Sequence, residues 1–255
     1  MSYLTTAQTL TRTPSRPPVR TPARSLLRLT LAFTLAFALA FALPLLAAGK
    51  AAAVEKFESV SVRMEQNLAD RDGEVVFEAT SGAAGLLELQ VVAPDGRVVI
   101  DFKAPQTRLG IRHLKLESPE PRDLVALRGD FPAGDYTFTG RTAAGTPLGG
   151  VATLSHRLPG AVWGVRPRPD ALNVSLKRLV IQWVADTNLA SCLVSIEAER
   201  TGAMLVQASL PGTATRFVVP DAVLLPGTRY KVSIGAVQAN GNGAFVESTF
   251  TTALK

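Results

Sequence analysis

The chain has 255 residues and a formal net charge of +6, with 27 Lys and Arg against 21 Asp and Glu. Six basic residues and no acidic ones lie in residues 1–53, so residues 54–255 carry 21 of each sign. The folded part is therefore not expected to bind nucleic acid or an anionic membrane through net charge. The single cysteine excludes an internal disulfide.

Residues 1–53 have the order of a secretory signal. An Arg- and Pro-rich stretch precedes the apolar run 29–48, and small residues follow that run. The A-x-A pattern of Ala51 and Ala53 predicts cleavage after Ala53, and Ala47-Ala48-Gly49 offers a second position. The apolar run has 20 residues, enough to span a bilayer, so an uncleaved anchor is the alternative. We expect an exported protein, periplasmic or extracellular, that contacts the membrane only if residues 29–48 remain.

The first half after the leader is a series of short β-rich runs separated by turn signals. The runs are "SVSVRM", "EVVFEA", "LLELQVV", "RVVIDF", "GIRHLKL", "DLVAL", "DYTFTG" and "GVATLSH". Asp95-Gly96 favours a tight hairpin between two of them, and "AAGTP" favours a second hairpin. This pattern is typical of a β-sandwich, which we expect over residues 54–158.

The second half begins after the proline-rich passage "HRLPGAVWGVRPRP", where a domain boundary is expected near residues 158–160. Six further runs follow, namely "RLVIQWVA", "SCLVSIEAE", "MLVQASL", "TRFVVP", "YKVSIGAV" and "AFVESTFTT". Each half has about 100 residues, enough for one sandwich core. The sequence therefore predicts an all-β fold with two tandem sandwiches, over residues 54–158 and 159–255.

The stretch "LLPGTRYKVSI" leads from a Pro-Gly turn into a tyrosine and an alternating strand. In immunoglobulin-like sandwiches, such a tyrosine bonds back to the chain just upstream and forms a tyrosine corner. Here the chain resembles the fibronectin type III family, whose motif is matched by Leu224, Pro226, Gly227, Thr228 and Tyr230. The stretch is expected to be scaffold rather than a binding site.

Further residues extend this resemblance over residues 161–255. Trp183 matches the core tryptophan of the family's second strand, Val194 and Ile196 match the third strand, and "STFTT" matches the last strand. Cys192 departs from the family, which usually has an aromatic residue there, and its alternation with Val194 predicts a buried free thiol. The structural core implied is Trp183, Tyr230, Pro226, Gly227, Cys192 and Val194.

The first half carries a related turn. In "FPAGDYTFTG", Pro132 precedes Tyr136 by four residues, as Pro226 precedes Tyr230. This half resembles an immunoglobulin-like domain of bacterial exported proteins, although "EVVFEA" has no tryptophan. A divergent duplicate and parallel use of a common turn remain open.

No catalytic motif is present. The two histidines, His113 and His156, fall in different predicted strands, and Ser155 would face away from its neighbour His156 in a strand. "ADRDGE" offers Asp70, Asp72 and Glu74 as oxygen ligands, but it lacks the full calcium-loop pattern, so a solvated turn is favoured. We expect no enzymatic activity, no metal site and no cofactor.

Two candidate ligand contacts remain. The tripeptide Arg128-Gly129-Asp130 is expected on a loop between two predicted strands. Trp163 is expected either to seal the joint between the domains or to lie exposed and stack on a sugar. "QANGNGAF", residues 238–245, is expected to be a plain hairpin turn.

The family resemblance implies a binding or spacing module rather than an enzyme, and this is an analogy at the level of fold. The first hypothesis is a non-catalytic protein-interaction or spacer module of the cell envelope or secreted fraction. The alternative is a carbohydrate-binding or adhesion module that uses Trp163 or residues 128–130. A third hypothesis is a hydrolase subunit whose catalytic residues lie on a partner chain. The expected partner is thus a protein or a glycan.

Overall fold

The computed structural model describes residues 53–254 except 107 and 109. The predicted signal and the anchor alternative, residues 29–48, lie outside the described residues. The described residues belong to one compact unit. Among them, no helix has the length and apolar character needed to cross a membrane.

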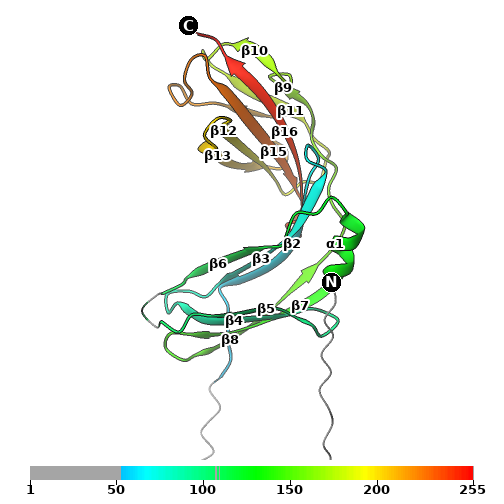
Figure 1. The fold of residues 1–255 in the computed structure, drawn as a ribbon, viewed down its shortest axis with the longest axis vertical. Helices are drawn as coiled ribbons and strands as arrows, with labels where there is room; N and C mark the ends of the chain where they lie inside the picture. The colour runs from blue at the N-terminus through cyan, green and yellow to red at the C-terminus, as the bar shows by residue number, and fades with distance from the viewer. Residues whose placement is uncertain (1–52, 107, 109, 255) are drawn as a thin grey trace, which may run out of the picture. The chain divides into compact units, whose positions relative to one another are not determined.

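The described residues form sixteen strands and one short helix, which confirms the all-β prediction (Figure 1). The elements are β1 (Glu55–Lys56), β2 (Ser59–Asn67), β3 (Asp72–Thr80), β4 (Leu86–Val92), β5 (Val98–Lys103), β6 (His113–Glu117), α1 (Leu124–Asp130), β7 (Gly134–Thr142), β8 (Pro147–Leu154), β9 (Trp163–Arg166), β10 (Ala171–Val174), β11 (Val180–Val184), β12 (Ser191–Ala198), β13 (Ala203–Pro211), β14 (Arg216–Val218), β15 (Arg229–Val237) and β16 (Gly243–Thr252).

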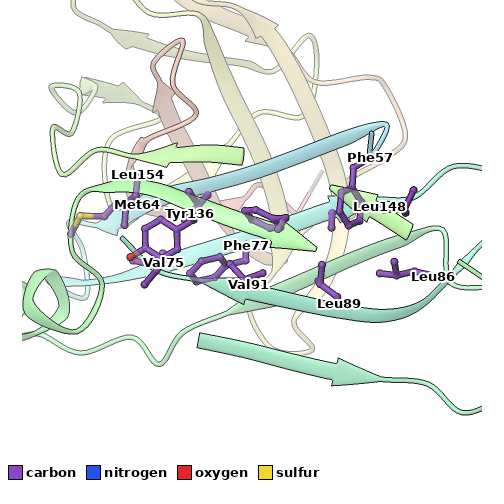
Figure 2. Close-up of a cluster of buried hydrophobic side chains, with 14 of the residues drawn as sticks. Phe57, Met64, Val75, Phe77, Leu86, Leu89, Val91, Tyr136, Leu148 and Leu154 are labelled. Atoms are coloured by element: carbon purple, nitrogen blue, oxygen red, sulfur yellow. The ribbon is translucent and has the colours of Figure 1, made fainter. Parts of the chain in front are cut away.

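The first sandwich packs the sheet β1-β8-β7-β4-β5 against strands β2, β3 and β6 (Figure 1). Alternate residues of β2, such as Val62 and Met64, turn inward because successive side chains of a strand point to opposite faces. Figure 2 shows the Tyr136 ring beside Phe77 in this core, and the two ring centroids are 5.6 Å apart. The core includes Phe57, Met64, Val75, Phe77, Leu86, Leu89, Val91, Tyr136, Phe138, Leu148 and Leu154.

The second sandwich packs strands β13-β12-β15-β16, with β10 beside β16, against the sheet β14-β11-β9. On β12, Cys192, Val194 and Ile196 are buried, as their alternation predicts. Trp183 of β11 is buried in the same core. Along the chain, Leu158 is the last residue that packs in the first core, and Val162 is the first residue of the second core.

Each sandwich has a tyrosine corner. The backbone N–H of Leu225 donates to the Tyr230 hydroxyl oxygen at 2.7 Å, and the Tyr136 hydroxyl donates to the Pro132 carbonyl at 3.0 Å. Both rings are buried, whereas the predicted core residues Pro226 and Gly227 are exposed in the turn. They shape the turn instead, since Gly227 has φ of 60°, which favours glycine.

A shared strand pairing joins the two sandwiches. The start of β16 pairs in parallel with the end of β2, from Gly243 opposite Glu65 to Phe245 opposite Asn67. The N–H of Leu68 then donates to the Phe245 carbonyl at 2.9 Å. The sheet β2-β3-β6 of the first sandwich and the sheet β13-β12-β15-β16 of the second therefore form one continuous sheet, and the connection at residues 158–162 is not their only link.

Asn242 lies at this joint and is only 1% exposed. Its Oδ1 accepts from the Met64 N–H at 2.9 Å, and its Nδ2 donates to the carbonyls of Ser155 at 2.6 Å and Arg157 at 2.9 Å. The loop around Asn242 is a hairpin turn between β15 and β16, as predicted. It is more than a plain turn, because one side chain of the second sandwich binds three backbone groups of the first.

The run "DLVAL" is a helix, so its prediction as a strand was wrong. The Asp123 carboxylate accepts from the N–H groups of Val125 and Ala126 at 3.0 Å each and caps the start of α1. Leu127 is buried in the first core. The N-cap and the buried Leu127 thus outweigh the β propensity of this short apolar run.

Replacing Tyr136 or Tyr230 by Phe removes one hydroxyl hydrogen bond and keeps the ring. We expect each change to lower the free energy of unfolding by about 1 kcal/mol. Urea unfolding measures it. The control Thr137→Ala, on the exposed face of β7, should cost less than about 0.5 kcal/mol. Equal values for Tyr136→Phe and the control would show that this corner bond contributes nothing.

Replacing Asn242 by Ala leaves the Met64 N–H and two carbonyls unpaired in a buried joint. An unsatisfied buried group costs about 1–3 kcal/mol, so we expect a loss of about 3 kcal/mol in the free energy of unfolding. Asn240→Ala removes one exposed acceptor in the same turn and should cost about 1 kcal/mol or less. A loss no larger in Asn242→Ala than in Asn240→Ala, by urea unfolding, would contradict the role of Asn242.

Candidate functional site

Arg128, Gly129 and Asp130 form the last turn of α1, so the prediction of a loop was wrong. All three residues are exposed. The Asp130 carbonyl accepts from Arg97 Nη2 at 2.7 Å, and the Phe131 N–H closes the helix on the Leu127 carbonyl. Side chains two positions apart on a helix do not face the same side. A single ligand surface therefore does not meet the Arg128 and Asp130 side chains together.

Trp163 is 51% exposed and lies on β9, a strand in the proline-rich passage that was not among the predicted β-rich runs. The expectation that Trp163 seals the joint was wrong, because its side chain is half exposed and belongs to neither buried core. A bulge turns the indole outward: Arg166 is opposite Gln182 but Trp163 is opposite Val184, so β9 holds one extra residue. Gly164 supplies the positive φ, 65°, at this bulge.

The outer face of the sheet β14-β11-β9 gathers polar and aromatic side chains. Gln182 is directly opposite Arg166 on one side and Arg216 on the other, so these three side chains form a row across the sheet. All three are exposed, and Trp163 with Val184 lies next to the row. We call Trp163, Arg166, Gln182, Val184 and Arg216 the indole–arginine face.

The indole–arginine face has uncompensated positive charge. Elsewhere in the second sandwich, Arg229 pairs with Asp170 at 2.8 Å, and Lys231 pairs with Glu197 at 2.8 Å. Arg166 and Arg216, by contrast, have no acidic group within ion-pair distance in the part of the chain that the structure describes. Two guanidinium groups, an amide and an indole are groups that bind anionic or sugar ligands. Sequence reasoning identified Trp163 but missed the row, which only the strand register reveals.

The acidic side chains of residues 70–74 are divided between a turn and a strand. Asp70 accepts a hydrogen bond from Asn67 Nδ2 at 3.1 Å in the turn, while Asp72 and Glu74 lie on β3. Among the described residues, no group of three or more His, Cys, Asp and Glu side chains is arranged to hold a metal ion. Gly73 lies inside β3, and this position needs a glycine because a Cβ there would stand 2.8 Å from the Glu65 carbonyl oxygen.

Glu74 has an unusual environment near the joint. It lies opposite Glu65 in the β2–β3 pairing and lines a shallow pocket with Glu120 and Glu247. Its Oε2 is buried with no hydrogen-bond partner among the described residues. Burial raises the pKa of Glu74 to about 7, and the negative charges of Glu117, Glu65 and Glu120 add to this rise.

The two histidines and the cysteine contact different parts of the fold. His113 Nδ1 lies 3.2 Å from the Thr80 hydroxyl, and His156 Nε2 lies 2.8 Å from the Phe131 carbonyl. Cys192 is completely buried, and burial raises the pKa of its thiol. The thiol therefore stays neutral and acts as a small apolar side chain.

The raised pKa of Glu74 predicts a pH dependence. In the folded chain the Glu74 carboxyl stays protonated up to about pH 7, whereas an ordinary glutamate has a pKa of 4.5. The free energy of unfolding therefore has its full value below pH 4.5, and part of it is lost as the pH rises through 7. Glu74→Gln removes this loss. We expect its Tm to exceed that of the original chain at about pH 8 and to match it at about pH 4. The exposed Glu55→Gln is the control, and a Tm gain of equal size at both pH values would contradict the assignment.

The chain matches no family model and no curated protein. The solved structures that this chain matches include fibronectin type III domains. They include the FN1–FN3 domains of chicken CNTN1 (12% identity, 79% of this chain, 69% of that chain, TM-score 0.33) and a two-domain segment of chicken tenascin (14% identity, 78% of this chain, 100% of that chain, TM-score 0.29). Fibronectin(III)-like modules of Clostridium thermocellum CbhA match at 10% identity over 80% of this chain and 92% of that chain, with a TM-score of 0.30.

These TM-scores are low, and no argument about ligand or activity rests on them. The strands themselves define the fold of the second sandwich: β9, β11 and β14 pack against β13, β12, β15 and β16, and Tyr230 forms the corner. The second sandwich therefore has a fibronectin type III-like fold.

Proposed function

We propose that this chain is a non-catalytic, exported protein-interaction or spacer module of the cell envelope or secreted fraction. Its fold is of a kind that hosts many functions, so the proposal rests on the joint rather than on the fold. The observation that carries it is Asn242, one buried side chain that binds Met64, Ser155 and Arg157 of the other sandwich.

Contacts between domains of one chain are by default polar and mobile. Here the contact is a strand pairing from Gly243 to Phe245 along β2, supported by the buried Asn242 amide. Turning one sandwich against the other would leave those backbone groups unpaired, at a cost of about 1–3 kcal/mol each. A fixed joint holds the loops of both sandwiches at a constant separation, which is the property that a spacer requires.

The amino-terminal sequence supports the cellular part of the proposal. A basic stretch, the apolar run 29–48 and small residues up to Ala53 follow in the order of a secretory signal. The balanced charge of residues 54–255 favours a protein or glycan partner over nucleic acid.

Cross-linking in intact cells tests the protein-interaction role. The tagged chain is captured after cross-linking, and partners are identified by mass spectrometry. We expect one dominant protein partner for the original chain and for Asn240→Ala, and at least a tenfold weaker capture for Asn242→Ala. Capture of glycan fragments without any protein would overturn the proposal, as would equal capture by Asn242→Ala in a folded state.

A second candidate function is a carbohydrate-binding or adhesion module, which the indole–arginine face favours. The indole of Trp163 offers an apolar surface for a sugar ring, and Arg166 and Arg216 offer charge-assisted hydrogen bonds to acidic groups. The ligand class that fits is an acidic polysaccharide.

Titration with an acidic polysaccharide tests this second function. We expect Trp163→Ala and Arg166→Ala each to weaken binding at least tenfold, and added salt to weaken it further. The control Arg200→Ala removes an exposed arginine on the turn between β12 and β13, away from the face. Binding that Arg200→Ala weakens as much as Arg166→Ala would be nonspecific attraction and would contradict a site.

A further inference from the structure

The edge strands of the described residues differ in how they are protected against pairing. Charged side chains lie on β5 and β6, and β14 has only three residues. In contrast, β13 has nine residues, Ala203–Pro211, and no charge. Among the described residues, β12 alone pairs with it, so its other side is open. Charge and shortness are two of the usual protections of an edge strand, and β13 has neither of these two, although a bulge and Pro211 bound its regular part.

The open side of β13 can be assigned from its pairing with β12. Pro211 lies opposite Ser191 but has no N–H to donate, so its nitrogen faces the open side. The N–H of the next residue, Gly212, points the other way and donates to the Ala190 carbonyl. Because backbone groups alternate along a strand, Gln207 and Ser209 also turn their N–H and C=O groups to the open side.

A regular segment of five residues is available for pairing. A bulge interrupts the pairing before it, since Ile196 is opposite Val206 but Glu197 is opposite Met204. Pro211 ends it on the other side. Within Val206–Leu210, Val206 and Leu210 pack against the core, and Gln207 and Ser209 are exposed.

We infer that Val206–Leu210 pairs antiparallel with the same segment of a second copy of this chain, about a two-fold axis at Ala208. In this register, Gln207 is opposite Ser209 of the second copy and exchanges both backbone hydrogen bonds with it. Ala208 lies opposite its own counterpart, and Val206 lies opposite Leu210. Each pair joins polar to polar or apolar to apolar side chains.

The absence of charge favours a second copy as the occupant. A two-fold axis sets a strand against its own sequence, so any charge on it would be repeated on the partner strand close to the axis. A strand such as β6, with Lys115 and Glu117, would place charges there, whereas β13 places none. The inference rests on this edge alone and is independent of the proposed function.

Sedimentation of the chain at concentrations from micromolar to millimolar tests the pairing. We expect a monomer–dimer equilibrium whose Kd rises at least tenfold in Gln207→Lys and in Ser209→Pro. The first adds charge at the axis, and the second removes an outward N–H without breaking the pairing with β12. The control Gln90→Lys makes the same change on β4, which β5 and β7 already flank.

A monomer at every concentration would overturn the inference, as would a dimer that Gln207→Lys does not weaken. Ala208→Cys gives a second test, because a non-hydrogen-bonded antiparallel pair has Cα atoms about 4.5 Å apart, within disulfide range. Under oxidising conditions we expect a covalent dimer from Ala208→Cys and none from Gln90→Cys. Equal yields from the two variants would contradict the two-fold axis at Ala208.

Discussion

The buried amide of Asn242 is the interaction on which the arrangement of the described residues depends. A side-chain amide is costly to bury unless all its hydrogen-bonding groups are paired. Here Oδ1 and both donors of Nδ2 reach Met64, Ser155 and Arg157 of the first sandwich. Because Asn242 directly precedes β16, the same contacts place the start of that strand beside β2, and the continuous sheet follows.

Joining the sheets also solves a problem that each sandwich would have alone. An open strand edge exposes unpaired backbone groups and invites pairing with other chains. Strand β2 would be one such edge and β16 another, and each covers part of the other from Gly243 to Phe245. Farther along, β10 covers β16, with Ala171 opposite Phe250. Among the described strands, β13 is the long edge that stays open and uncharged, on the opposite side of the sheet.

The surface that best suits a ligand depends on a small backbone irregularity. With regular alternation, Trp163 would lie on the same face as Val165, which packs against the core. The extra residue at Gly164 breaks this alternation and places the indole on the outer face, next to the row of Arg166, Gln182 and Arg216. A core-like residue thus becomes part of a polar surface, and a bulge is a common device for re-aiming a side chain.

The sequence by itself determined the features that local pattern controls. Alternation of apolar residues predicted most strands, and turn residues predicted the Asp95-Gly96 and "AAGTP" hairpins. The tyrosine corners followed from the resemblance of two short turn motifs to immunoglobulin-like domains. Each of these features is decided by neighbours within a few residues. The prediction failed in three places: "DLVAL" is a helix capped by its own Asp123, β9 forms in a proline-rich passage, and residues 128–130 are helical rather than a loop. Only the tertiary structure decided the joint, since Asn242 and Met64 are 178 residues apart. The strand register that aligns Arg166 with Arg216 could not be predicted from local pattern either. A contact between two segments that are remote in sequence leaves no periodic signal in either segment.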